Sequence, residues 1–271
     1  MPSVICTGTV MQAEDGAFYH DKMVGMLQAL WGEGFLSPGG PDEVARLVAG
    51  SDFAGKSVLD IGCGAGGIDI ALVSNHGAGY VCGIDVEDGV LSHARALIAR
   101  RGLSDRIGCM KVAPGPLPFP PETFDIVFSK DSIVHIADKH SLMTEVFRIL
   151  KPGGWFVASD WLIGHDGPPS PEMADYIRAE GLDFGMASPA RYRDAMQKAG
   201  FGQITVTSRN AWYRDVARTE LERLKGPVGR EAAKQVGQDF VDENIGIWSR
   251  MITVIDTGEH CPTHLKGQKP A

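Results

Sequence analysis

The stretch VLDIGCGAGG, Val58 to Gly67, decides the fold of this chain, together with GIDV at Gly83 to Val86. It is typical of a strand that runs into a glycine-rich turn, followed by a second strand that ends in an acidic residue. The glycines leave the backbone bare where a ligand can approach closely. Asp85, at the tip of the second strand, can accept hydrogen bonds from both hydroxyls of a ribose. This pattern predicts an enzyme with a nucleoside cofactor lying across the carboxyl ends of parallel strands.

Two cofactors fit the glycine spacing. Gly62, Gly64 and Gly67 also satisfy the dinucleotide fingerprint GxGxxG, in which a pyrophosphate meets a helix N-terminus. Asp60, two positions before the first glycine, would repel a pyrophosphate but suits the ammonium end of S-adenosylmethionine. We therefore predict S-adenosylmethionine, with Asp60, Gly62, Gly64 and Asp85 among its contacts. An NAD-dependent oxidoreductase and a non-catalytic nucleotide-binding protein stay open as alternative classes.

The charge of the chain argues against nucleic acid and membrane partners. The 271 residues are 44% hydrophobic and 22% charged, an ordinary globular composition. The net charge is −8 with a pI near 5.5, and no run of Lys or Arg offers a basic face for phosphates. No apolar stretch approaches the roughly 18 residues of a membrane span, and the N-terminus does not resemble a secretory signal. We expect no nucleic acid and no membrane as partners.

The cysteines predict a reducing compartment. The chain has five, an odd number, with no CxxC pair, so reduced thiols in a cytoplasmic protein are the expectation. The segment HCPTH, His260 to His264, resembles a metal-binding tract, but a polar tail is the favoured interpretation. We therefore predict no metal site.

The order of predicted elements indicates an α/β fold. From residue 56 strands alternate with helices, which implies a parallel sheet with right-handed crossovers and helices on both faces, a doubly wound, Rossmann-like arrangement. Strands are expected at 57–62, 80–86, 107–112, 124–129 and 155–161, and helices at 68–74, 90–102 and 141–150.

The two ends of the chain depart from this alternation. Residues 1–50 are predicted to form an N-terminal lid with helices at 13–30 and 41–50 and a glycine-rich loop between them. Residues 51–271 form the cofactor-binding domain, with acceptor-binding helices at about 165–200 and 212–245. A strand is expected at 203–209, a helix or strand at 241–256, and a frayed polar tail at 260–271.

Several further motifs resemble a known family. WGEGFLSPGG, VLDIGCGAGG, GIDV, FSKDSIVHI, LKPGG, SDW and GIWSR together resemble the class I S-adenosylmethionine-dependent methyltransferases, and within them the phosphoethanolamine N-methyltransferases. The resemblance runs from about Phe18 to the tail. It implies a class I methyltransferase sheet with an N-terminal helical lid and a helical insertion before the last strands.

The resemblance implies catalytic roles for two residues, and spacing adds a third. Tyr19 and His135 fall where the family carries a latch over the methyl acceptor. A histidine suits this place because a protonated amine has no lone pair and needs a base. Asp131, four positions before His135, would lie one helical turn away and orient the imidazole or touch the methionine end of the cofactor. The alternatives are a surface pair at Tyr19, a buried structural histidine at His135 and a helix N-cap at Asp131.

On the cofactor side the resemblance adds Leu36, Ser37, Val86 and Lys130 to the predicted contacts. At Ala113 the chain departs from the family, which carries an Asp there to accept the adenine amino group. Adenine must then be held by backbone groups or a neighbouring side chain. We expect binding to survive, because one such hydrogen bond contributes only ~1–3 kcal/mol.

The family's phosphate clamp is largely replaced. Tyr176 fits one tyrosine of the clamp, Trp161 replaces another, Glu180 stands at an arginine position and Met251 at a lysine position. A phosphate dianion facing Glu180 would be repelled. Arg250 lies nearby and would compensate in part. Packing roles for Trp161 and Met251 are the alternative interpretation.

These substitutions predict a small-molecule methyltransferase that acts on a polar amine or amino acid and not on phosphoethanolamine. The Glu180 carboxylate among the aromatic faces of Trp161, Tyr176 and Trp248 suits a cationic or zwitterionic acceptor. S-methylation of a thioether or thiol such as methionine is the alternative, and a thioether would need no base. The expected partner is the small-molecule methyl acceptor, and the expected assembly is a monomer or homodimer.

Overall fold

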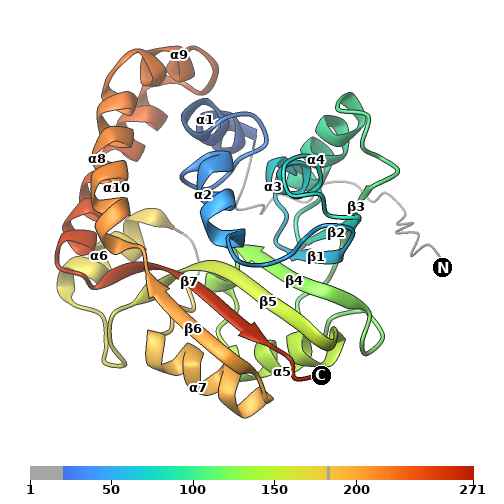
Figure 1. Cartoon of the computed structure of the whole chain (residues 1–271). Coiled ribbons are helices and arrows are strands. Elements are labelled where there is room, and N and C mark those ends of the chain that lie inside the picture. Colours follow the sequence, from blue (N-terminus) through green and yellow to red (C-terminus); the bar gives the residue numbers. More distant parts are fainter. Residues whose placement is uncertain (1–20, 182–183) are drawn as a thin grey trace.

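The chain forms one seven-stranded sheet (Figure 1). The structure is a computed structural model that describes residues 21–181 and 184–271. The strand order is β3-β2-β1-β4-β5-β7-β6, in which β1 to β5 are parallel and β7 is antiparallel to both of its neighbours. The strands are β1 Ser57–Ile61, β2 Tyr80–Asp85, β3 Ile107–Lys111, β4 Phe124–Lys130, β5 Leu150–Ile163, β6 Gly202–Ser208 and β7 His260–Gln268.

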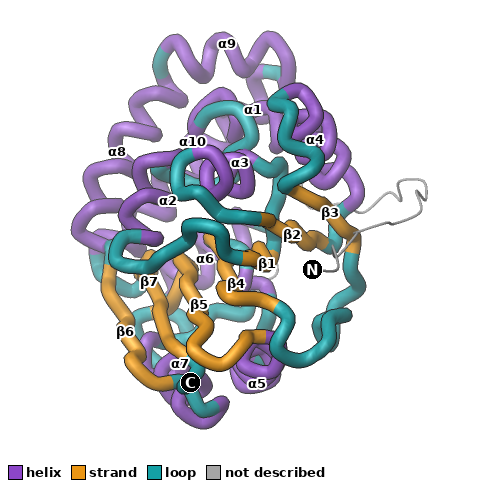
Figure 2. Tube along the Cα trace, turned by 45° about the vertical axis from the view of Figure 1, so that its right-hand side comes forward, coloured by secondary structure: helices purple, strands orange, loops and turns teal. Residues whose placement is uncertain are grey.

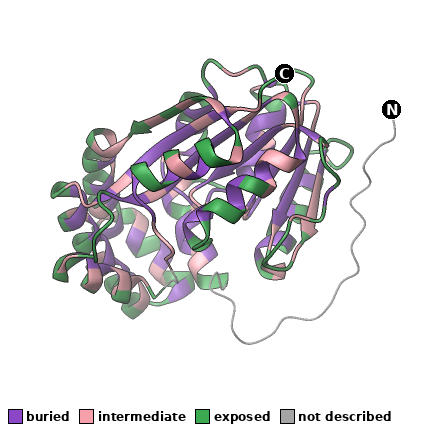
Figure 3. Ribbon diagram, turned by 90° about the horizontal axis from the view of Figure 1, so that it is seen from below, coloured by how far each residue is buried: buried purple, intermediate pink, exposed green. Residues whose placement is uncertain are grey.

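Helices cover both faces of this sheet. Adjacent residues of β1 show why: Val58 packs with the helices of one face and Leu59 with those of the other, because successive side chains of a strand point in opposite directions. Figure 3 shows the buried strands enclosed by helices with exposed outer surfaces. One face carries α2 Gly40–Val48, α3 Gly67–Ser74 and α4 Asp88–Arg100, and the other carries α5 Lys139–Ile149 and α7 Pro189–Ala199. The predicted doubly wound α/β fold is confirmed.

A separate helical layer stands beside the sheet (Figure 2). In it α1 packs against α8 and α9, and α10 packs against α6 and α8. Its apolar cluster joins Leu27 of α1, Tyr213 of α8 and Trp248 of α10. The members are α1 Asp21–Trp31, α6 Pro171–Glu180, α8 Asn210–Lys225, α9 Pro227–Val236 and α10 Gln238–Asp256. Of the predicted acceptor-binding stretch 165–200, only α6 joins this layer, because α7 packs against α5.

The C-terminal segment corrects the sequence-based expectation. The tail predicted to fray is the strand β7, which lies inside the sheet between β5 and β6. Its polar side chains find partners far away in sequence: the His264 ring lies 2.8 Å from Glu43 Oε1 in α2. Such pairing leaves no signal in the local sequence, so the polar composition was misleading.

Two other boundaries were resolved by the structure. The segment 241–256 is helical, within α10. The LKPGG motif, predicted to end a helix, belongs to the start of β5, since α5 already ends at Ile149. None of the helices in the described ranges 21–181 and 184–271 combines the length and the apolar character needed to cross a membrane.

Candidate functional site

The glycine turn after β1 folds onto the end of β2. The backbone N–H groups of Gly62 and Cys63 both donate to the carbonyl oxygen of Ile84, at 2.8 and 3.0 Å. Gly62 has a φ of 76°, and a Cβ there would lie 1.7 Å from Ser132 Oγ, so no other residue fits. The turn therefore has the bare backbone that a cofactor's methionine portion requires.

Asp85 closes this turn from the next strand. Its carboxylate accepts hydrogen bonds from Gly64 N and Glu87 N, both at 3.1 Å. Burial raises the pKa of Asp85, and these backbone donors oppose the rise. Val86 beside it is 48% exposed, which leaves an apolar surface next to the carboxylate. Ala113 is exposed just after the neighbouring strand β3, so this corner suits a ribose and an adenine.

The loop before α2 packs on the same turn. Gly67 N donates to Gly34 O at 3.0 Å, and Leu36 Cδ1 lies 3.2 Å from the position a Cβ at Gly64 would take. The Lys130 ammonium holds the loop by donating to Ser37 Oγ at 2.8 Å, and it also donates to Asp131 Oδ2 at 2.6 Å. Lys130 is buried. Its side chain therefore supports the loop, and its predicted contact with the cofactor stays a prediction.

Asp60 also departs from its predicted place. Its carboxyl group is buried beneath the turn, where it contacts the carboxyl group of Asp69 in α3, and neither has another hydrogen-bond partner among the described residues. Burial raises the pKa of Asp60 to about 7 and that of Asp69 well above its usual range. A proton shared by the two acids explains the contact, since two adjacent carboxylates would repel. Asp60 supports the turn from below and does not reach the surface where an ammonium group would bind.

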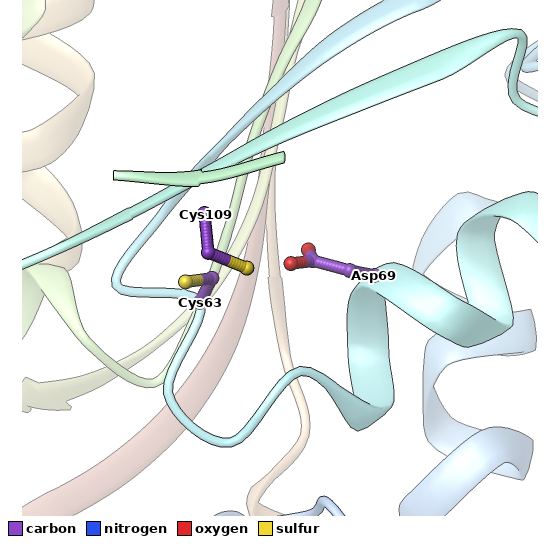
Figure 4. Close-up of side chains that lie close together, drawn as sticks. All are labelled: Cys63, Asp69 and Cys109. Carbon is purple, nitrogen blue, oxygen red and sulfur yellow. The ribbon is translucent and has the colours of Figure 1, made fainter. Parts of the chain in front are cut away.

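Two thiols lie close to the Asp69 carboxyl group, as Figure 4 shows. Cys63 from the turn, Asp69 from α3 and Cys109 from β3 bring their ligand atoms within 4.8 Å of one another. A hydrogen bond with Cys109 and burial raise the pKa of the Cys63 thiol. Thiols and carboxyls at this spacing could hold a thiophilic cation. The prediction of no metal site is therefore untested.

The carboxyl pair predicts a pH effect on stability. An acid whose folded pKa is raised stabilises the fold below its unfolded pKa, near 4, and this stability is lost as pH rises through the folded value of about 7. Asp69→Asn removes one acid and gives Asp60 an amide donor. The free energy of unfolding of the wild-type protein should fall between pH 5 and pH 8. In Asp69→Asn this fall should be smaller by roughly 2–4 kcal/mol, at 1.36 kcal/mol per pKa unit. Chemical denaturation at both pH values measures this difference, with the exposed Asp105→Asn as control; an unchanged fall would contradict the shared proton.

His135 lies at the mouth of a cavity, on a short 3-10 turn at Ile133–His135. Its ring is exposed and lies 5.6 Å from the ring of Phe184, centroid to centroid. The predicted helical turn between Asp131 and His135 is wrong, because Asp131 has a φ of 59°. The Asp131 carboxylate accepts from Ser159 Oγ at 2.8 Å and from Lys130, and it does not cap a helix. Tyr19 lies outside the described residues, so the predicted latch stays a prediction.

The wall of the cavity is mainly apolar, and six of its side chains are Trp, Tyr or Phe. Trp161 stacks on His260 with ring centroids 4.8 Å apart, and Tyr213 meets it edge-on at 4.9 Å. The cavity also reaches Ser37 and His135, so it adjoins the cofactor side of the site. The aromatic side chains that line it are Trp31, Trp161, Tyr176, Phe184, Tyr213 and Trp248.

The predicted acceptor residues are only partly brought together. Trp161, Tyr176, Glu180 and Met251 all line the cavity. Burial raises the pKa of Glu180 to about 7. Arg250 does not line it: this side chain is exposed and its Nε donates to Asp175 Oδ2 at 2.9 Å. The structure therefore does not bring Arg250 together with the other predicted acceptor residues.

Sequence reasoning missed several wall residues. Glu220 of α8 is buried behind the rings, and Asn244 faces the cavity from α10. In ARTELERLK nothing distinguishes Glu220 from a surface acid. Trp248 of the GIWSR motif, which the sequence placed among the aromatic faces around Glu180, does line the cavity. Trp31 was within reach of prediction, because it begins the WGEGF loop.

Asp85→Ala should weaken cofactor binding by ~2–3 kcal/mol. The change removes a charged acceptor for two hydroxyls, and hydrogen bonds to charged groups contribute about that much. Calorimetry with S-adenosylhomocysteine measures the loss. Asp88→Ala, in the first turn of α4, is the matched control and should bind normally. Unchanged affinity in Asp85→Ala, or tight NAD binding by the parent protein, would contradict this cofactor site.

Comparison with known proteins places the chain among methyl-transferring enzymes. Residues 59–158 match the family model described as a methyltransferase domain. The chain is 31% identical over 241 residues to a phosphoethanolamine N-methyltransferase of Triticum aestivum, covering 88% of this chain and 46% of the relative. It is 29% identical over 265 residues to phosphoethanolamine N-methyltransferase 1 of Zea mays, covering 92% and 50%. The chain thus spans about half the length of the curated relatives it matches.

Solved structures give the same fold. Phosphoethanolamine N-methyltransferase 2 of Haemonchus contortus, in complex with S-adenosyl-L-methionine, matches with a TM-score of 0.85 at 26% identity, covering 95% of this chain and 59% of that one. A geranyl diphosphate C-methyltransferase from Streptomyces coelicolor A3(2) matches with a TM-score of 0.66 at 17% identity, covering 84% and 75%. At that identity the second likeness shows the fold alone.

Proposed function

This chain belongs to the class I S-adenosylmethionine-dependent methyltransferases, and from that premise we propose that it methylates the nitrogen of a small polar amine or amino acid. The observation that carries the proposal is the cavity beside His135. Its wall is mainly apolar and rich in aromatic rings, it contains the carboxyl groups of Asp131 and Glu180, and no Lys or Arg lines it among the described residues. Such a wall suits an ammonium group. The relatives and the solved structures are methyltransferases, which does not support the alternative class of NAD-dependent oxidoreductase.

Different residues of the chain would bind the cofactor and activate the acceptor in such a transfer. When bound, S-adenosylmethionine supplies an electrophilic methyl group. Asp85 would hold the ribose and the glycine turn the methionine portion, so that the cofactor's methyl group faces the cavity. His135 at the cavity mouth would take the proton from the acceptor ammonium and free the nitrogen lone pair. Methyl transfer is an in-line displacement, so holding acceptor and cofactor in line supplies most of the acceleration.

S-methylation is a second candidate. The apolar wall, which includes Met251, would also accept a thioether. A thioether carries a lone pair at every pH, so His135 would then only position the acceptor. The two candidates therefore differ in whether loss of the imidazole abolishes turnover.

Phosphoethanolamine is the acceptor that the names of the relatives indicate, and the comparisons do not bear out its exclusion. Our proposal of a phosphate-free acceptor is supported by charge. Arg178 and Arg250 both pair with Asp175 outside the cavity, so neither replaces the missing clamp. Glu180 would meet the phosphate instead.

Methyl incorporation from labelled S-adenosylmethionine tests the proposal across amines, amino acids, thioethers and phosphoethanolamine. We expect turnover with at least one phosphate-free amine and little with thioethers. Transfer to thioethers alone would establish the second candidate. Efficient transfer to phosphoethanolamine would contradict the charge argument, and no transfer to any of these acceptors would contradict the proposed function.

A further inference from the structure

Glu220 is a buried acid that the proposed reaction does not use. It lies in α8 and is 3% exposed. Three ring groups donate to its carboxylate: Trp31 Nε1 at 2.6 Å, Tyr213 OH at 2.9 Å and Trp248 Nε1 at 3.2 Å. The donors come from α1, α8 and α10, which lie side by side in Figures 1 and 2. One carboxylate therefore joins three helices of the helical layer.

Neutral ring donors, and no cation at ion-pair distance, surround the Glu220 carboxyl group among the described residues. Burial raises its pKa, whereas the three donors favour the charged form. No Lys, Arg or His of the described residues lies within ion-pair distance of it. Lys130 acts on it only at longer range, and its own ammonium is engaged by Ser37 and Asp131. No cationic side chain of the described residues therefore balances a negative charge on Glu220 at short range, and a bound cation would do so.

The same three donors form part of the cavity wall. Trp31, Tyr213 and Trp248 line the cavity, and Trp31 and Trp248 lie with ring centroids 5.9 Å apart. An indole or phenol that donates to a carboxylate gains electron density in its ring, and electron-rich ring faces attract cations. The charge of Glu220 reaches the cavity through these rings, while the carboxylate itself stays covered.

We propose that Glu220 is the counter-ion of a cation receptor that selects small alkylammonium ions without an anionic group, which narrows the proposed acceptor from an amine or amino acid to an amine without a carboxylate. The inference rests on the proposed function, since the receptor is the acceptor site. In the transfer the N–C bond forms, the C–S bond breaks with its electron pair going to sulfur, and positive charge moves from sulfur to nitrogen. Glu220 favours that charge on nitrogen, and it acts through the rings as a specificity-determining residue.

A pair of ligands with one shape and different charge tests the receptor. Choline and 3,3-dimethylbutan-1-ol differ mainly in a quaternary nitrogen and a carbon at the same place. Binding is measured by calorimetry and by the fluorescence of the wall tryptophans, in the presence of S-adenosylhomocysteine. The wild-type protein should bind choline at least tenfold more tightly than the neutral analogue. In Glu220→Gln this preference should fall to threefold or less, with the affinity for the neutral analogue unchanged.

Matched variants separate charge from packing. Glu222→Gln changes an exposed acid of the same helix and should keep the full preference. If Glu220→Gln does not fold, Trp31→Phe removes one donor and keeps a ring, and it should reduce the preference at least twofold. Equal affinity of the wild-type protein for the two ligands would overturn the receptor, as would a full preference in Glu220→Gln. The binding assay involves no methyl transfer, so it tests the receptor separately from the reaction. If the wild-type protein prefers choline to the neutral analogue but methylates none of the tested acceptors, only the proposed function is overturned.

Discussion

Replacing His135 by alanine is expected to lower turnover by about 10²–10⁴-fold while the affinity for the cofactor stays nearly unchanged. The imidazole lies at the mouth of the acceptor cavity, apart from the glycine turn and Asp85. An amine acceptor is mostly protonated at neutral pH and cannot attack until a base removes that proton. The loss should therefore appear in the rate and not in cofactor binding.

Steady-state turnover and calorimetry with S-adenosylhomocysteine measure the two parts of this prediction. His140→Ala is the control, because that histidine is exposed on α5 and pairs with Asp194. Full activity of His135→Ala would reject base catalysis and favour a thioether acceptor. A loss of cofactor affinity as large as the loss of turnover would mean that His135 belongs to the cofactor site.

The second large effect concerns Glu180. The wild-type protein is expected to bind phosphoethanolamine about 10²–10⁴-fold more weakly than a site with two cationic contacts would. Two lost charged hydrogen bonds at ~1.5–3 kcal/mol each amount to ~3–6 kcal/mol, and 1.4 kcal/mol is one decade of affinity. Glu180→Arg should abolish activity on phosphate-free amines, and it should increase activity on phosphoethanolamine.

Competition assays with both acceptors measure this reversal. Glu172→Arg introduces the same charge at an exposed position of α6 and should leave the preference unchanged. A micromolar Michaelis constant of the wild-type protein for phosphoethanolamine would contradict the prediction. The clamp of this chain would then be built from residues other than those at the aligned positions.

The fold could be predicted where its signals are local. The glycine turn and the acidic end of β2 lie in one βαβ unit, so Gly62, Gly64 and Asp85 were placed in their correct neighbourhood from the sequence. The strand β7 was missed, because its polar residues are stabilised by pairing with β5 and β6 and by Glu43. No window of sequence contains those partners.

The acceptor site was predictable only in part, for a geometric reason. Along α10, neighbouring residues point about 100° apart. Met251 and Trp248, three positions apart, therefore share the cavity face, while Arg250 points outward to Asp175. Proximity in sequence could not show this. The burial of Glu220 could not be predicted for a similar reason, because its hydrogen-bond donors come from three helices that are far apart in the sequence.

The most direct measurement is the carbon-13 NMR spectrum of the product formed with methyl-labelled S-adenosylmethionine and a phosphate-free amine. The chemical shift of the transferred carbon tells whether it is bound to nitrogen or to sulfur. We expect an N-methyl signal that grows in step with S-adenosylhomocysteine and is nearly lost with His135→Ala. An S-methyl signal from a mixture of amine and thioether acceptors, or no product signal with any phosphate-free amine, would contradict the account.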